Sequence, residues 1–343
     1  MPAEWARHDA TWIAWPHYDP DWPGKMGAIP WVYAEIVRVL HSHERVEILC
    51  HDERVRDEAV EVLNAHAVSP SGYRLHLVRT DRVWLRDSAP TFVRSDKGAV
   101  ELINWRFNGW SKYDNFSNDE RVGEEIEKIT QLHRSIATRP DSVGDWLVLE
   151  GGGIETDGEG TLLVTEEWLL SNVQVRNPGM SRTDYEQAFG EYLGVTKAIW
   201  LGNGCVGDDT HGHIDDIARF AAPGVVLLAY EENASDPNHA PSLDNLLRLE
   251  RAATTQSIRI VKLPYPRAIV MDGQRLPASY ANFYIANGVV IVPTFNDPMD
   301  RVALSIIERE FPEREVVGIH AVDLVWGLGT LHCLTQQQPA AAE

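Results

Sequence analysis

The sequence predicts an α/β fold in which one structural unit is repeated around a closed ring. Two observations support this prediction. Apolar, strand-like runs alternate with amphipathic helical stretches along the whole chain. In addition, polar loops that carry chemically active side chains recur at nearly constant intervals, as in folds built from one repeated unit. No Pro-, Gly- or Ser-rich linker interrupts the 343 residues, so we expect a single domain over residues 1–339.

Short apolar runs bounded by turn residues predict the strands. They lie at 11–15, 45–49, 74–78, 161–165, 224–230 and 288–293. Apolar residues spaced three and four apart predict the helices. These are expected at 29–43, 53–65, 118–133, 183–193 and 242–257, the last starting at Ser242 with a cap-like Ser-x-x-Asn. The polar, alanine-rich C-terminus predicts fraying after Gln337 and disorder over 340–343.

Five equivalent loops are indicated by the spacing of four side chains. Asp87 and Glu150 are 63 residues apart, as are Glu150 and His213, and Cys333 follows His213 by 120 residues. Because the last interval is close to twice the others, one loop of the series lies between His213 and Cys333. It is expected near residue 273, where Asp272-Gly273 interrupts an apolar run.

The charge balance excludes two classes of partner. Lys and Arg number 31 against 51 Asp and Glu, a formal net charge of −20. A field of that sign repels phosphate backbones and anionic lipids and attracts cations, so we expect no nucleic acid and no membrane as partner. No apolar segment approaches the ~18 residues of a membrane span, and three cysteines are too few for a disulfide framework. These features predict a cytoplasmic protein in a reducing compartment.

Cys333 is the first candidate for a reactive side chain. It follows Gly327 and Gly329, which permit a close approach of the backbone, and His332 precedes it directly. Such a turn can present a thiol to a ligand, although a lone cysteine is commonly a small buried hydrophobe. A nucleophilic thiolate also needs a partner that protonates the leaving group, commonly a histidine.

The segment 207–220 supplies histidines in the string His211-x-His213-x-Asp215-Asp216. Alternate residues of an extended strand share one face, so His211 and His213 could form the metal site of a metal-dependent hydrolase. The other histidines of the chain show no clustered pattern of further ligands. In the preferred interpretation no metal is bound, His213 acts as acid and base, and Asp215 supplies a carboxylate.

Two further carboxylates, Asp87 and Glu150, stand where apolar runs end in turns. Several carboxylates around a nucleophile would repel the oxyanion formed from a peptide or an ester. They suit a planar guanidinium, whose N–H donors are matched by paired carboxylates. The set of residues therefore predicts a small cationic guanidine as the ligand.

Five strings carry a resemblance to a known family. They are W-L-R-D-S-A-P (84–90), L-E-G-G-G-I (149–154), D-T-H-G-H-I-D-D (209–216), A-S-Y-A-N-F-Y-I-A-N-G (278–288) and L-H-C-L-T-Q-Q (331–337). Together they resemble the agmatine deiminase family, also called the bacterial-type peptidylarginine deiminase family, over nearly the whole chain. The resemblance implies a pentein fold, which is a five-bladed pseudosymmetric α/β propeller of ββαβ units.

The resemblance also implies a role for each matching residue. Cys333 is similar to the nucleophile of the family, and His213 to its acid and base. Asp87 and Asp215 are similar to the carboxylates that bind the guanidinium. Glu150 is similar to the acid that orients the histidine and touches the substrate.

Four residues are candidates for binding the rest of the substrate. Trp84 and Trp110 are expected to cover its aliphatic part, Asp209 to meet a charged tail, and Gly329 to allow close approach. Two departures from the family concern this region. Leu328 interrupts the glycine run before Cys333, and the loop 104–116 has no Gly-Gly after Trp110.

The implied reaction is hydrolysis of agmatine to N-carbamoylputrescine and ammonia through a covalent amidino-cysteine, a step of polyamine biosynthesis without metal or organic cofactor. Deimination of peptidyl or free arginine and amidino transfer to an amine stay open on the same scaffold. A metal-dependent hydrolase and a non-catalytic guanidine-binding module are the alternatives from other classes. Arg82 and Arg86 are both expected to point away from the site, which disfavours the α-carboxylate of arginine. Assembly into a homo-oligomer is also left open.

Overall fold

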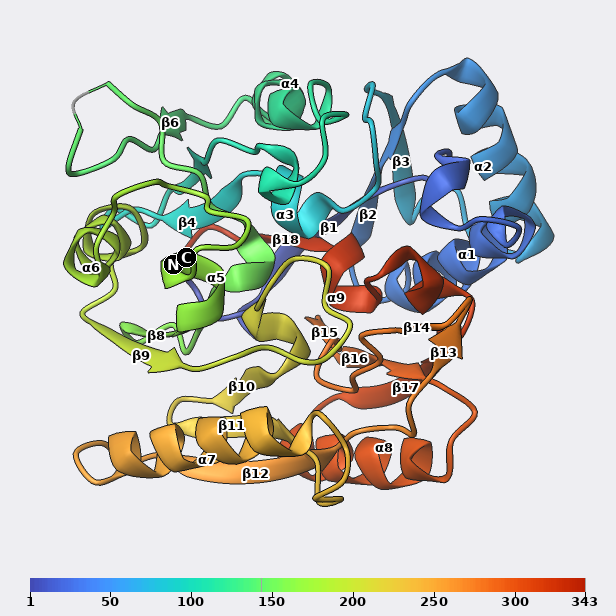
Figure 1. The fold of residues 1–343 in the computed structure, drawn as a ribbon. Coiled ribbons are helices and arrows are strands. Elements are labelled where there is room, and N and C mark those ends of the chain that lie inside the picture. The colour runs from blue at the N-terminus through green and yellow to red at the C-terminus, as the bar shows by residue number, and fades with distance from the viewer. Residues whose placement is uncertain (143, 343) are drawn as a thin grey trace.

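A computed structural model describes residues 1–142 and 144–342 as a mixed α/β fold (Figure 1). Within these residues, five sheets of three or four strands follow one pattern, and a two-stranded hairpin stands apart from them. In each of the five sheets the first strand pairs antiparallel with the second, and the second pairs parallel with the third. A parallel pair needs a crossover, which a helix supplies in each case. The repeated unit is therefore strand, strand, helix, strand, as the resemblance implies.

Four of these sheets are formed by continuous parts of the chain. They consist of β4 (Thr91–Arg94), β5 (Val100–Asn104) and β6 (Arg134–Ile136); β7 (Glu155–Thr156), β8 (Thr161–Thr165) and β9 (Lys197–Leu201); β10 (Ala218–Ala222), β11 (Val225–Tyr230) and β12 (Arg259–Pro264); and β15 (Tyr284–Ala286), β16 (Val289–Thr294) and β17 (Glu315–His320). The separate hairpin pairs β13 (Val270–Met271) with β14 (Gln274–Arg275).

The fifth sheet joins the two ends of the chain. Its strands lie in the order β18 (Gln336–Pro339), β1 (His8–Ala14), β2 (Arg45–Cys50) and β3 (Tyr73–Leu77). Because β18 pairs antiparallel with β1, the C-terminal segment that follows Cys333 is held against the N-terminal strand. The marks of the two termini lie side by side in Figure 1 for the same reason.

The long helices lie at the periphery of the molecule (Figure 1). They are α1 (Ile29–Leu40), α2 (Glu53–Ala65), α4 (Val122–Thr130), α6 (Arg182–Leu193), α7 (His239–Ala253) and α8 (Pro298–Glu310). Short helices stand in the loops instead: α3 (Leu85–Ser88), α5 (Glu166–Leu170) and α9 (Leu331–Leu334). Single 3₁₀ turns complete the list at η1 (Asp19–Asp21), η2 (Met26–Ala28), η3 (Gly109–Ser111), η4 (Asp119–Arg121), η5 (Gly151–Gly153), η6 (Ile214–Asp216) and η7 (Leu324–Gly327).

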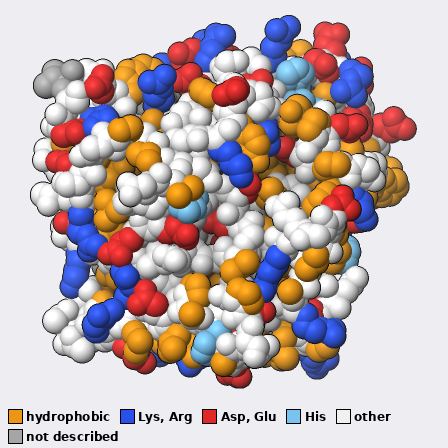
Figure 2. All heavy atoms as spheres, in the orientation of Figure 1, with side chains coloured by type: hydrophobic (Ala, Val, Ile, Leu, Met, Phe, Trp, Pro, Cys, Tyr) orange, Lys and Arg blue, Asp and Glu red, His pale blue; other side chains and the backbone are white. Residues whose placement is uncertain are grey.

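Buried apolar side chains of the described residues form two clusters. The larger contains the inner strands of most sheets together with α1. The smaller surrounds β8 and β9 and includes Trp168, Tyr185 and Phe189. On the surface, side chains of both charges are interspersed with apolar ones on the face that Figure 2 shows. None of the helices in the described part of the chain has the length and apolar character needed to cross a membrane.

Most of the predicted elements are confirmed, with shifted ends. All six predicted strands are present, as β1, β2, β3, β8, β11 and β16, and the helix at 53–65 has the predicted bounds. The helix expected at 118–133 divides into η4 and α4 and stops at Thr130, because Gln131 adopts a left-handed conformation (φ 59°). The helix expected from Ser242 begins at His239 instead. Ser242 lies inside it, and its hydroxyl donates to the His239 carbonyl.

The C-terminus is more ordered than its composition predicts. Fraying after Gln337 is wrong, because β18 continues to Pro339. The backbone N–H groups of Ala340 and Ala342 then donate to the carbonyls of Arg7 and Gly98. Disorder over 340–343 stays a prediction only for Glu343, which lies outside the described residues.

The spacing of the candidate residues has a structural basis. Asp87, Glu150, His213 and Cys333 each lie three to five residues before the first strand of a sheet, namely β4, β7, β10 and β18. The missing loop therefore precedes β15, and its equivalent position lies close to Asn282 rather than at 273. The hairpin at Asp272-Gly273 does form, with both residues at positive φ, but it is an addition to the repeated unit.

Candidate active site

A cavity of about 450 Å³ opens among these loops. Six of the nine predicted site residues line it: Cys333, Asp87, Trp84, Trp110, Asp209 and Gly329. The other three, His213, Glu150 and Asp215, are buried. His213 and Asp215 lie next to Asp87 and Cys333 of the cavity wall, and Glu150 lies next to His213. The structure thus brings residues from distant parts of the sequence to one place.

Asp87 stands in the short helix α3 with both carboxylate oxygens engaged. Oδ2 accepts a hydrogen bond from Trp110 Nε1 at 2.8 Å, and Oδ1 accepts one from the Gly152 amide at 3.0 Å. His213 Nδ1 lies 3.7 Å from Oδ1. The carboxylate is therefore held in place at the cavity wall while one oxygen faces the imidazole.

Glu150 lies deeper than Asp87 and has no exposed surface. Its Oε1 is paired with Arg176 Nε at 3.0 Å, and its Oε2 accepts from Trp168 Nε1 at 2.6 Å. His213 Nε2 lies 3.4 Å from the same Oε2. Glu150 thus faces one side of the His213 ring while Asp87 faces the other.

The three glycines after Glu150 are explained by close contacts. A Cβ atom on Gly152 would lie 2.6 Å from His213 Nδ1 and 2.8 Å from Asp87 Oδ1. One on Gly153 would lie 2.4 Å from the Trp168 ring. Only glycine leaves room for the imidazole and the carboxylate to meet above this turn.

Asp215 is the carboxylate that lies next to the Cys333 thiol. It lies in η6, completely buried, and its Oδ2 is 2.7 Å from His332 Nδ1 and 3.6 Å from Cys333 Sγ. Its other oxygen, Oδ1, is buried and has no hydrogen-bond partner among the described residues, and the same holds for His213 Nδ1. Because unpartnered buried polar atoms are costly, these two atoms indicate where a ligand would donate or accept.

Cys333 lies in the short helix α9, after a loop in which Leu328 adopts a left-handed conformation (φ 69°). A Cβ on Gly329 would lie 2.7 Å from the Trp84 ring and 3.1 Å from Cys333 Cβ, so glycine is needed here for packing. Leu328, the departure from the family pattern, also lines the cavity. The loop thereby keeps the thiol at the cavity wall.

Asn282 is a site residue that the sequence reasoning missed. Its Nδ2 donates to Cys333 Sγ at 3.1 Å and to Asp216 Oδ1 at 3.0 Å, while its Oδ1 accepts from the His332 amide at 3.0 Å. It is fully buried in the fifth loop. The string at 278–288 contains Asn282, but the regular spacing predicted the fifth loop near residue 273, about nine positions before Asn282.

The electrostatics of the site favour a protonated histidine. Burial opposes the charge of His213, but Asp87 and Glu150 outweigh it and raise the pKa of His213 to about 9. Burial would likewise raise the pKa of Glu150, yet the charges of Arg176 and His213 hold it at about 2. Near neutral pH, His213 is an imidazolium and Glu150 a carboxylate.

The same electrostatics disfavour an anionic thiol in the free protein. Burial, together with Asp215 and Asp216, raises the pKa of the Cys333 thiol well above its ordinary value. Burial also raises the pKa of Asp87 to about 6. A cation bound between these carboxylates and Sγ would reverse both effects, because it stabilises each anion.

A metal site of His211 and His213 is not supported by the geometry of the described residues. His211 adopts a positive φ of 65°, so the segment is not the extended strand that would place both rings on one face. The His211 Nε2 atom lies 2.9 Å from Ser171 Oγ, whereas His213 faces Glu150. The group with metal-ligating atoms within 4.8 Å of one another is instead Asp215, Asp216 and Cys333.

Two ion pairs involve side chains that line the cavity. Lys112 Nζ is paired with Asp209, whose Oδ2 also accepts from Tyr113 OH at 2.7 Å. Arg82 is paired with Asp21, and its guanidinium lies 4.1 Å from the centre of the Tyr113 ring. Asp209 therefore lies at the cavity wall, as expected for a tail-binding residue, but it already has a cationic partner.

The expectation that Arg82 points away from the site is wrong, because Arg82 lines the cavity. The expectation for Arg86 is confirmed: it is buried and bonds to Gln337 and Glu4. The expectation assumed that side chains alternate between two faces of an extended segment, but residues 81–84 do not form a strand. The amides of Asp81 and Arg82 are bound by the Asp119 carboxylate, and α3 follows at once.

Comparisons with known proteins agree with this fold and site. A family model described as Porphyromonas-type peptidyl-arginine deiminase matches residues 1–339. The agmatine deiminase of Pseudomonas aeruginosa (strain LESB58) is 35% identical over 366 residues, covering 99% of this chain and 95% of the relative. That of Pseudomonas syringae pv. syringae (strain B728a) is 36% identical over 366 residues, with the same coverage.

Solved structures lead to the same class. The structure of an agmatine deiminase of Enterococcus faecalis has a TM-score of 0.88 and 30% identity, covering 99% of this chain and 95% of that chain. The fold is thus that of the agmatine deiminase structures. By its match over residues 1–339, the chain belongs to the Porphyromonas-type peptidyl-arginine deiminase family.

Proposed function

We propose that this protein is a guanidine hydrolase that converts agmatine and water into N-carbamoylputrescine and ammonia. The observation that carries the proposal is the grouping of Cys333 with two buried carboxylates, Asp87 and Asp215, beside one cavity. A thiol surrounded by carboxylates suits a cationic carbon electrophile rather than one that becomes an oxyanion. The relatives named agmatine deiminases support the same substrate.

Guanidinium binding would satisfy the polar atoms that lack a partner. The buried Oδ1 of Asp215 can accept one N–H of the planar cation, and Asp87 on the other side can accept a second. Trp84 and Trp110 line the cavity next to these carboxylates and would pack against the aliphatic chain. The cation also lowers the cost of forming the Cys333 thiolate, because its charge offsets the carboxylates.

When the cation binds, the Cys333 thiol releases its proton to solvent, and in the first chemical step the thiolate attacks the guanidinium carbon. A C–S bond forms, one C–N bond breaks, and His213 transfers its proton to the departing nitrogen, which leaves as ammonia. The product is an amidino group bound to Cys333. Glu150 stabilises the imidazolium before the transfer and orients the ring through the 3.4 Å contact with Nε2.

In the second step the neutral His213 takes a proton from water, and the water oxygen attacks the amidino carbon. The C–S bond breaks, the thiolate leaves, the hydroxyl proton of the former water passes to solvent or to the ammonia, and the neutral ureido product is released. These steps use neither a metal nor an organic cofactor. The net charge of −20 should favour capture of a dication, an effect that salt screens over a Debye length of ~8 Å.

Arg82 favours arginine as a second candidate substrate. Arg82 lines the cavity, where it is paired with Asp21, so an α-carboxylate that displaces Asp21 would meet a cation. A preference of agmatine over arginine therefore no longer follows from a lack of cations at the site. Arg82→Gln is expected to lower kcat/KM for arginine more than that for agmatine, and an equal effect on both would exclude a role for Arg82 in tail recognition.

The test of the proposed function is identification of products from agmatine, arginine and a peptide with C-terminal arginine. We expect equal amounts of ureido product and ammonia from agmatine. Transfer of the amidino group to an added amine would indicate an amidinotransferase instead. Binding of agmatine without turnover by fully folded protein would indicate a binding module and would contradict the proposal.

We also propose the finer architecture. The five sheets of the ββαβ pattern support a pentein-type propeller with one catalytic domain over residues 1–339. The three cysteines are free thiols, which supports a cytoplasmic location. Assembly of identical copies remains a proposal that a measurement of molar mass in solution would test.

A further inference from the structure

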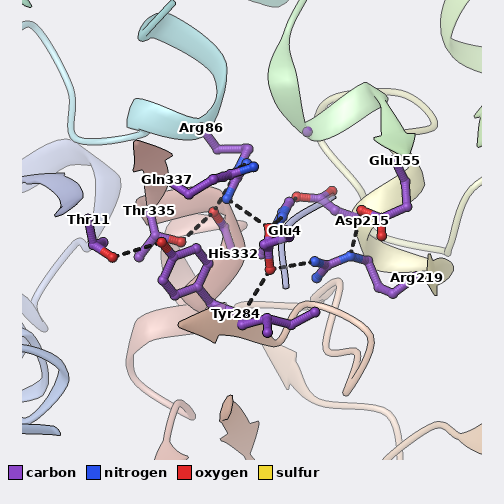
Figure 3. A network of polar contacts seen from close by, with 12 residues as sticks. Glu4, Thr11, Arg86, Glu155, Asp215, Arg219, Tyr284, His332, Thr335 and Gln337 are labelled. Atoms are coloured by element: carbon purple, nitrogen blue, oxygen red, sulfur yellow. Dashed lines mark hydrogen bonds and ion pairs between the residues drawn. The ribbon is translucent and has the colours of Figure 1, made fainter. Parts of the chain in front are cut away.

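A buried ionic network lies behind Asp215 (Figure 3). Its centre is Glu4, a residue of the N-terminal segment, which receives hydrogen bonds from side chains on three other parts of the chain. Arg86 Nη2 lies 3.2 Å from Glu4 Oε2, Arg219 Nη2 lies 2.8 Å from Oε1, and His332 Nε2 lies 2.8 Å from Oε2. The network therefore connects the N-terminus with the residue next to Cys333.

His332 is bound on both ring nitrogens by carboxylates. Nε2 faces Glu4, and Nδ1 lies 2.7 Å from Asp215 Oδ2. Carboxylates accept hydrogen bonds and do not donate them, so both nitrogens must carry a proton. The ring is an imidazolium and is 1% exposed. Figure 3 shows His332, Glu4 and Asp215 in the same network.

The contact with His332 gives the two oxygens of Asp215 different surroundings. Oδ2 is occupied by His332, while Oδ1 is buried and has no partner among the described residues. The carboxylate cannot turn without breaking a charge-assisted hydrogen bond, which is shorter and stronger than a neutral one. Asp215 is thus held with Oδ2 beside Cys333 Sγ and with Oδ1 free of partners among the described residues.

Charge balance explains how the imidazolium persists in a buried place. Three cations, Arg86, Arg219 and His332, are matched by three carboxylates, Glu4, Glu155 and Asp215. Without Glu4, three positive groups would face only two negative ones. A buried cation with a missing partner is strongly unfavourable, so loss of Glu4 would weaken the hold on the His332 ring.

We propose that His332 is a positioning residue for the proposed reaction. Its ring fixes the Asp215 carboxylate in the orientation in which it meets the substrate guanidinium beside Cys333, and Glu4 keeps the ring charged and oriented. The inference rests on the proposed function, because it takes Asp215 as a carboxylate that binds the guanidinium. It assigns a function to Glu4 of the N-terminal segment, which is 328 residues away from His332 in the sequence.

Two substitutions at one position separate positioning from packing. Asparagine places an amide near the position of Nδ1 and can still donate to Asp215, whereas glutamine reaches the position of Nε2 and can donate only toward Glu4. We expect His332→Gln to lower kcat/KM for agmatine about 100-fold and His332→Asn only about 10-fold. If His332 served packing alone, the smaller asparagine would be the more damaging replacement.

His8→Gln is the matched control. His8 is another buried histidine paired with a buried glutamate, Glu44, at 3.2 Å, and it does not line the cavity. Its replacement should destabilise the fold to a similar extent, measured by thermal unfolding, and leave kcat/KM within about twofold. Glu4→Gln should lower kcat/KM as His332→Gln does.

Three results would overturn the inference. These are equal activities of His332→Gln and wild type, a more active glutamine than asparagine variant, or a loss in His8→Gln as large as that in His332→Gln. If the wild type forms no ureido product, the proposed function fails instead. In that case, agmatine binding measured by calorimetry on the same variants tests the role of His332, because His332→Gln should still bind agmatine more weakly than His332→Asn.

Discussion

His213 Nε2 lies 3.4 Å from Glu150 Oε2, and this contact between two buried groups governs how the site can exchange protons. Glu150 also has Arg176 and Trp168 as partners, so its charge is held in place on one side of the ring. Asp87 lies on the other side. The imidazolium is therefore stabilised from two directions, which is what a general acid acting near neutral pH requires.

A bell-shaped pH profile of kcat/KM follows from two pKa values. Asp87 must be ionised to bind a cation, and its pKa is raised to about 6, so activity should fall as the pH drops through about 6. His213 must be protonated to donate, and its pKa is raised to about 9, so activity should fall as the pH rises through about 9. Initial rates with agmatine at subsaturating concentration measure both limbs.

Glu150→Gln tests the assignment of the alkaline limb. Glu150 is one of the charges that raise the pKa of His213, so its neutral replacement should move this limb to lower pH. The acidic limb, assigned to Asp87, should move less, because Glu150 is a smaller contributor there. An alkaline limb that stays in place would remove His213 as its cause.

Cys333→Ser should bind agmatine and lose turnover, because a hydroxyl forms an anion far less readily than a thiol. Mass spectrometry of wild-type enzyme quenched during turnover should find the amidino adduct on Cys333 only. Cys50→Ser and Cys205→Ser are the controls and should retain activity, since neither residue lines the cavity. Normal turnover by Cys333→Ser would defeat the covalent mechanism.

Asp87→Asn and Asp215→Asn keep the shape of the side chain and remove its charge. Each should reduce kcat/KM by about 1.5 to 3 kcal/mol, the range for a charge-assisted hydrogen bond. Asp157 offers a matched control, because it is buried and accepts from the amides of Glu159 and Thr161 outside the cavity. Losses of the same size in Asp157→Asn would mean that folding, rather than guanidinium binding, is affected.

Gly152→Ala should lower activity through a direct clash. The new Cβ would lie 2.6 Å from His213 Nδ1, so the imidazole or the turn must shift, and catalytic geometry tolerates little displacement. Gly190→Ala in α6 is the control, since its Cβ would make only an ordinary contact at 3.5 Å. Steady-state kinetics on both variants compare the two sites, and full activity in Gly152→Ala would show that the turn can move without consequence.

Exhaustive chelation should leave activity unchanged. The proposed steps place positive charge through the substrate and His213, and the two histidines expected as metal ligands face different neighbours. Metal content by elemental analysis and activity before and after chelation provide the measurement. Stoichiometric metal whose removal abolishes activity would favour a site at Asp215, Asp216 and Cys333 instead.

The sequence by itself determined the local features and the chemistry. Periodicity predicted the strands and most helices because side-chain spacing reflects the geometry of each element. The intervals between Asp87, Glu150 and His213 predicted the repeated unit, because each residue precedes the first strand of a sheet. The thiol, the imidazole and the carboxylates were sufficient to predict a guanidine as ligand.

Only the tertiary structure decided which groups contact one another across long separations. His332 and Asp215 are 117 residues apart, and Asn282 and Cys333 are 51 apart, yet each pair shares a buried hydrogen bond. The direction of Arg82 depended on Asp119, which binds its amide from another loop. Such contacts arise from the packing of whole sheets and from backbone turns, neither of which is encoded in the spacing of residues along one segment.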